Sequence, residues 1–244
     1  IMSLLKDVLL LDYAMRYDPD LIVWLVTAES FPADKQLFPP PVQNNPGPVR
    51  DLIAAYDLHI DPQDTRFVEP DFLGRTIVGQ RRALADLLRL QLYAVPWAIT
   101  GIDQYLPDDY TPRTEDFDED LSWGEAFPEP QPLSEDDLAF EVLRAGLARA
   151  GDVPVLLVNE PMFVSAGINS ELRYNFFYPR WAYDAYHALL DTAANEQGWH
   201  YVDLWDALPN EVYTDSPVHY TPDGAQMLAE RVSAVVLELV GATE

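Results

Sequence analysis

Three short apolar runs, separated by stretches with helical periodicity, constrain the fold of this chain most strongly. They cover residues 21–27, 153–158 and 199–204, and the first is apolar on both faces, as in a parallel strand covered by helices on both sides. Helices are predicted at about 135–150 and 179–196, before the second and third runs. Parallel strands need such crossover connections. The pattern predicts a three-layer α/β/α parallel sheet in which the three strands are adjacent.

The stretch between the first two runs is far longer than a crossover needs, and it predicts an insertion at about 31–134 within one domain, residues 1–244. Helices are expected in it near 47–57 and near 71–95. The most apolar part, Ala83 to Thr100, is interrupted by charged residues and by proline, so we expect a buried helix there and no membrane span.

The second half of the insertion, about 103–137, holds thirteen acidic residues against a single base and is rich in proline. Such a segment buries too little apolar surface to order itself, so we expect an acidic loop or flexible lid. Its aromatic residues are the candidates to anchor it to the body of the protein: Tyr105, Tyr110, Phe117, Trp123 and Phe127.

The charge balance of the chain limits the classes of molecule that it is expected to bind. Fifteen basic residues against 41 acidic ones give a net charge of -26, which argues against nucleic acids and anionic lipid surfaces. Neutral partners such as sugars or acyl esters are expected. Cysteine is absent, and His59, His187 and His200 lack the spacing of paired ligands, so neither a metal nor a cofactor is predicted.

The sharpest chemical signal lies directly before a predicted last helix that starts at about Pro222. It reads Tyr213-Thr-Asp-Ser-Pro-Val-His-Tyr-Thr-Pro-Asp-Gly224. The imidazole of His219 can take up and return a proton near neutral pH, and a carboxylate on the same loop can orient it. Asp215 is the candidate for that carboxylate.

This segment resembles the last conserved block of the SGNH/GDSL hydrolases, in which an acid and the catalytic histidine precede the C-terminal helix. The resemblance implies that His219 is a general acid/base and that Asp215 orients it. Asp215 stands four residues before His219, and Ser216 occupies the position at which the family usually has its acid.

A second resemblance covers residues 17–30, which are similar to the family's strand that ends in Gly-x-Asn-Asp. Glu29 stands where the family has an asparagine that donates to the oxyanion, and it is either a substrate or solvent contact or a salt-bridged loop residue. Ser30 is a candidate oxyanion donor. Asn159 and Glu160 follow the second run, at the strand edge where open α/β sheets bind ligands, and are assigned to the substrate region.

The polar and aromatic stretch 169–181 is compatible either with a sugar site or with purely structural side chains.

The family's flavodoxin-like sheet has the strand order 2-1-3-4-5, and this chain matches only its last three strands. The Gly-Asp-Ser nucleophile block has no counterpart here. We therefore expect a sheet that is incomplete at the N-terminus, a nucleophilic serine upstream of the chain, and an exposed edge at 21–27 that leaves residues 1–244 inactive and unstable alone.

The implied activity is that of a serine esterase on a small-molecule or carbohydrate ester. An O-acyltransferase, or a non-catalytic glycan-binding or envelope-assembly module, is the alternative. An extracytoplasmic location is expected, with membrane contact only through an anchor upstream; without such a segment the protein would be cytoplasmic.

Overall fold

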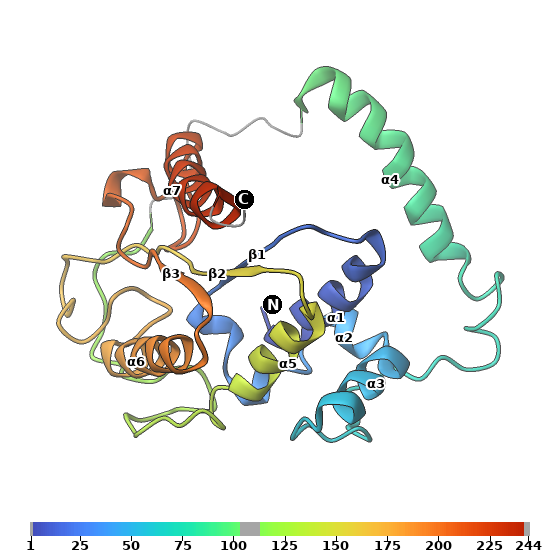
Figure 1. Cartoon of the computed structure of the whole chain (residues 1–244), viewed down its shortest axis with the longest axis horizontal. Helices are drawn as coiled ribbons and strands as arrows, with labels where there is room; N and C mark the ends of the chain where they lie inside the picture. The colour runs from blue at the N-terminus through green and yellow to red at the C-terminus, as the bar shows by residue number, and fades with distance from the viewer. Residues whose placement is uncertain (1, 103–112, 242–244) are drawn as a thin grey trace. The chain divides into compact units, whose positions relative to one another are not determined.

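The computed structural model describes residues 2–102 and 113–241 (Figure 1). Two compact units are present. The main unit takes residues up to 67 together with those from 111 onward, and the second unit covers 68–110. The insertion expected over 31–134 is thus divided, because its two ends belong to the main unit and only its middle is separate.

The main unit is built on a parallel three-stranded sheet. Its strands are β1 (Ile22–Val26), β2 (Val155–Asn159) and β3 (His200–Asp203), in the order β1-β2-β3. Trp24 lies opposite Leu157, and Val158 lies opposite Val202. The prediction that the three apolar runs form adjacent parallel strands is confirmed, and at this level the fold is α/β.

Helices cover both faces of the central strand. All of β2 is buried, and its residues alternate between two hydrophobic clusters. Val155 and Leu157 belong to the larger cluster, whereas Leu156 and Val158 pack with α7 (Pro222–Gly241). In Figure 1, α7 lies on one side of the sheet, and α5 (Phe140–Ala150) and α6 (Arg180–Gln197) lie on the other.

Close packing joins α5 to the sheet and to α1 (Leu4–Ala14). A Cβ atom on Gly146 of α5 would lie 2.5 Å from the Trp24 ring, so only glycine lets the helix approach this strand. The Ser3 hydroxyl caps α1 by accepting a hydrogen bond from the Lys6 backbone amide. Short helices α2 (Pro40–Gln43) and α3 (Pro46–Tyr56) contact α1 as well.

Within the described residues, β1 forms an edge of the sheet. Val23 is 40% exposed and Leu25 is 42% exposed. A groove of about 420 Å³ runs along this strand and α1, and its walls are largely apolar. The predicted exposed edge at 21–27 is therefore present. The expectation that helices cover both faces of this strand is wrong, because Val23 and Leu25 lie exposed on one face and the strand covered on both faces is β2.

The described part of the acidic segment, 113–137, forms neither a regular helix nor a ladder strand. Trp123 and Phe127 are buried in the main core and join in an isolated bridge, as expected for anchoring residues. Its backbone also accepts hydrogen bonds from the body, including one of 2.7 Å from the Trp181 indole to the Leu121 carbonyl. Tyr105 and Tyr110 lie outside the described residues.

The second unit consists of turns at about 71–79 followed by α4 (Arg81–Thr100). The prediction of a buried helix here is wrong, since α4 has no buried residue. The described part of the unit contains no other helix or strand that could cover it. The helix also begins about ten residues later than predicted, because Gly74 and Gly79 keep the preceding stretch in turns. In the described part of the chain, no helix has the length and apolarity needed to cross a bilayer.

Candidate active site at the carboxyl edge of the sheet

The loop that carries His219 is held against the carboxyl edge of the sheet by backbone hydrogen bonds. Phe163, which follows β2, donates to the Pro217 carbonyl at 2.8 Å. Within the loop, Thr214 donates to the His219 carbonyl at 2.9 Å, and Tyr213 and Tyr220 form an antiparallel bridge. This hairpin-like closure presents His219 at the start of α7.

His219 and Asp215 form a hydrogen-bonded pair at the surface. The distance between His219 Nδ1 and Asp215 Oδ1 is 3.1 Å, within the reach predicted from the sequence. The side chains are 62% and 52% exposed, respectively. The hydrogen bond from His219, helped by one from Thr214, lowers the pKa of Asp215. Because Nδ1 is engaged, Nε2 is the ring atom available for proton exchange.

Glu160 lies next to this pair in a more enclosed position. Its backbone amide donates to the Val26 carbonyl at 2.9 Å, which links β2 to the end of β1. The Tyr220 hydroxyl lies 3.1 Å from Glu160 Oε1 and 2.8 Å from the Pro161 carbonyl oxygen. Burial raises the pKa of Glu160 to about 7, although the Tyr220 hydrogen bond and the charge of His219 partly offset this effect.

Tyrosines surround the Glu160 carboxylate. Burial, reinforced by the negative charge of Glu160, raises the pKa values of Tyr178, Tyr213 and Tyr220. The Tyr213 hydroxyl is buried and has no hydrogen-bond partner among the described residues. Glu160 therefore sits among neutral phenols, where a carboxyl group that is partly protonated at neutral pH can donate or accept a proton.

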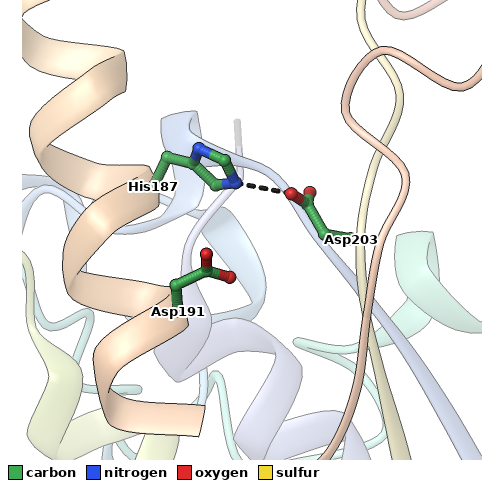
Figure 2. Close-up of side chains that lie close together, drawn as sticks. All are labelled: His187, Asp191 and Asp203. Carbon is green, nitrogen blue, oxygen red and sulfur yellow. Dashed lines mark hydrogen bonds and ion pairs between the residues drawn. The ribbon is translucent and has the colours of Figure 1, made fainter. Parts of the chain in front are cut away.

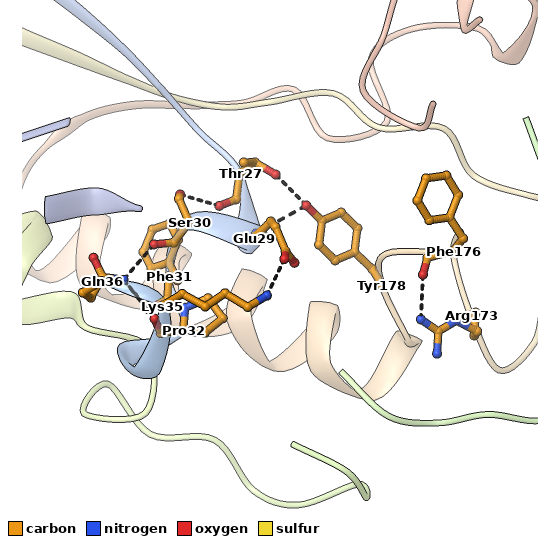
Figure 3. A network of polar contacts seen from close by, with 10 residues as sticks. All are labelled: Thr27, Glu29, Ser30, Phe31, Pro32, Lys35, Gln36, Arg173, Phe176 and Tyr178. Carbon is orange, nitrogen blue, oxygen red and sulfur yellow. Dashed lines mark hydrogen bonds and ion pairs between the residues drawn. The ribbon is translucent and has the colours of Figure 1, made fainter. Parts of the chain in front are cut away.

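The turn after β1 uses its polar groups internally, as Figure 3 shows. The Glu29 carboxylate forms an ion pair with Lys35. The Glu29 backbone amide donates to the Tyr178 hydroxyl at 3.3 Å, and that hydroxyl lies 2.6 Å from Thr27 Oγ1. The structure therefore agrees with the interpretation of Glu29 as a salt-bridged loop residue.

Ser30 is buried and its hydroxyl donates to the Thr27 carbonyl at 2.7 Å. The Gln36 amide, also buried, donates to the Ser30 carbonyl at 3.0 Å and to that of Pro32 at 2.9 Å (Figure 3). Ser30 thus holds the turn together, and its hydroxyl is committed to the backbone within this conformation.

Asn159 belongs to a network beneath the edge of the sheet. Its side-chain amide donates to Asp203 at 2.8 Å, and its carbonyl oxygen accepts from the Tyr186 hydroxyl at 2.9 Å. Asp203 in turn lies 2.5 Å from His187 Nε2 (Figure 2). This hydrogen bond raises the pKa of His187. The network ties β2, β3 and α6 together, so Asn159 supports the edge of the sheet. Of the two neighbours Asn159 and Glu160, only Glu160 lies close to the His219–Asp215 pair.

Among the described residues, His187, Asp191 and Asp203 have the spacing to hold a cation. Their ligand atoms lie within 4.8 Å of one another, with His187 and Asp191 one turn apart on α6 (Figure 2). The His187–Asp203 hydrogen bond already engages two of the three ligands. A metal ion would have to displace the proton they share.

The polar groups of the aromatic stretch 169–181 also form hydrogen bonds within the protein. Arg173 is buried and donates to the carbonyl of Phe176 (Figure 3) and to that of Asp120. Asn175 is buried and donates to the Phe163 carbonyl at 2.9 Å. Its polar groups thus support the structural interpretation of this stretch.

Two serines near the edge are buried. Ser165 is buried and its hydroxyl donates to the Glu115 carbonyl. Ser216 is buried, and its carbonyl accepts from the His219 amide at 3.3 Å. From the sequence alone, no role was assigned to Tyr220, although its position directly after His219 was a usable signal, and Tyr178 was placed only within the aromatic stretch 169–181.

Comparisons of the chain with protein-family models, with curated proteins and with solved structures found no match.

Proposed function

We propose that the chain carries the acid/base part of an SGNH-type ester hydrolase. The observation that supports this most is the hydrogen-bonded His219–Asp215 pair, exposed at the carboxyl edge of a parallel sheet beside Glu160. Ligands of open α/β sheets bind at this edge. A carboxylate at Nδ1 orients the imidazole and stabilises it when it becomes charged, which is the arrangement that nucleophilic ester cleavage requires.

In the proposed reaction, Nε2 of His219 takes the proton of a serine hydroxyl while the serine oxygen bonds to the ester carbonyl carbon. The tetrahedral intermediate then expels the alcohol, which receives that proton from Nε2. Water repeats the sequence and releases the acid. The hydroxyls of Ser165 and Ser216 do not suit the nucleophile role, being buried, so the proposal takes the serine from outside the 244 residues.

A neutral substrate suits the acidic surface. A net charge of -26 repels anionic substrates over several ångströms, whereas it leaves an acylated sugar or another neutral ester unaffected. If the acceptor is a sugar hydroxyl instead of water, the same residues perform acyl transfer.

A non-catalytic glycan-binding module is the second candidate, and one observation favours it. Glu29 is ion-paired with Lys35 at the position where the resemblance calls for an oxyanion donor. A carboxylate cannot stabilise a developing negative charge.

The two candidates differ in their response to His219→Gln. Hydrolysis of a neutral acetyl ester and of acetylated oligosaccharides would be measured for the complete gene product. The matched control is His59→Gln, since His59 also pairs with a carboxylate, Glu141, at 2.9 Å on the surface. An enzyme loses at least about 100-fold in kcat/KM with His219→Gln and keeps its rate with His59→Gln. Glycan binding without turnover in any variant would instead establish the binding module.

A further inference from the structure

We propose that α4 docks on the surface of a lipid bilayer, with its axis along the membrane plane. Most apolar side chains of the helix gather on one side, although Arg81 and Gln91 also lie on that side and Leu90 lies off it. Its apolar sector comprises residues that share one side of the helix and are each between 45% and 78% exposed: Leu84, Leu87, Leu88, Leu92, Val95 and Ile99. The polar stripe on another side holds Arg82, Asp86 and Arg89, spaced at helical intervals of four and three.

The described residues of the second unit do not cover this sector. Its described remainder is the turn segment before α4, and that segment adds exposed apolar residues, with Phe72 at 87% and Ile77 at 79%. Large apolar side chains exposed together on one side of a helix indicate an interaction site. At 20 residues α4 is about 30 Å long, but it lacks the apolarity to span a bilayer, which leaves an orientation along the surface.

Charge favours lipid over a second copy of the chain. The helix α4 carries three arginines and one aspartate, a net charge of +2, which leaves -28 on the other residues of the chain. The whole-chain charge therefore does not describe this segment. Two copies would repel each other through their acidic remainders, whereas a bilayer takes up the leucines and leaves the arginines at the headgroups.

Two aromatic residues of α4 lie on the side of the polar stripe. Tyr93 and Trp97 are stacked, with ring centroids 5.9 Å apart; at helical spacing Tyr93 falls among the residues of the stripe and Trp97 falls beside it. Rings with an apolar body and a polar edge are enriched at the level of the lipid headgroups.

Cosedimentation with phosphatidylcholine vesicles, alone and with one fifth phosphatidylglycerol, tests the proposal on the whole chain. Wild-type protein should bind both. Leu88→Glu with Leu92→Glu should weaken binding by about 100-fold or more, because two leucines leave the apolar phase. The matched control, Arg82→Gln with Arg89→Gln, changes the net charge equally but spares the apolar sector. It should retain binding to phosphatidylcholine and lose the gain from the anionic lipid.

Circular dichroism and the thermal midpoint of each variant check that the main unit stays folded. The proposal is overturned if wild-type protein ignores both vesicles, or if the arginine variant loses as much binding as the leucine variant. A lipid-free dimer that Leu88→Glu with Leu92→Glu disperses would assign the sector to a second copy. Protection of α4 amides from hydrogen exchange in a lipid-free monomer would assign it to the chain's own surface.

Discussion

Glu160→Gln tests whether the carboxyl group beside His219 is held in its protonated form. The folded state raises the pKa of Glu160 from 4.5 to about 7, mainly through burial. Between these values the folded protein keeps a proton that the unfolded chain has released. Stability is therefore lost as the pH rises through this window. This rise in the pKa corresponds to about 3 kcal/mol of unfolding free energy, and partial solvent contact reduces that figure.

Glutamine has the shape of the protonated acid and can still accept the Tyr220 hydrogen bond. The stabilisation by Glu160→Gln, measured by urea unfolding, should therefore be larger at pH 8 than at pH 5 by about 2 kcal/mol. The control is Glu211→Gln, at an exposed position, which should show the same small effect at both values of pH. A Glu160→Gln effect that does not change with pH would refute the buried-acid account.

Two further substitutions test the packing of the sheet. Gly146→Ala places a methyl group against Trp24 and should destabilise the protein by about 1–3 kcal/mol in denaturant unfolding. The control Gly47→Ala, whose methyl group meets no atom within 4 Å, should be neutral or slightly stabilising. Equal unfolding midpoints for the two variants would contradict the packing of Gly146 against Trp24. Val23→Lys with Leu25→Lys should suppress aggregation, seen as lower light scattering at equal concentration, because charge protects an open strand edge. Scattering that is unchanged would show that this edge is already covered.

The central strand was predictable from the sequence because burial on both faces leaves a continuous apolar run. Val155 to Val158 shows this directly, since neighbouring residues pack into opposite clusters. At α4, a similar excess of apolar residues led to the wrong prediction of a buried helix. The composition of α4 favours burial of side chains such as Leu88 and Ile99, but it does not specify what covers them. No described residue of the second unit buries them.

The candidate site was predictable only where its residues are neighbours in the chain. Asp215 and His219 share one loop, so their contact follows from local spacing. The enclosure of Glu160 depends on Tyr178 and Tyr220, which come from segments distant from it in sequence. No local pattern encodes that burial, or the commitment of the Ser30 hydroxyl to a backbone carbonyl.

The central claim is that His219 activates a serine, and covalent trapping tests it most directly. The complete gene product would be treated with a fluorophosphonate, and the adduct would be located by mass spectrometry. The account predicts a single modified serine outside the 244 residues, labelled at least about 100-fold more slowly with His219→Gln and at the wild-type rate with His59→Gln. Absence of any adduct, or labelling that His219→Gln leaves unchanged, would contradict it.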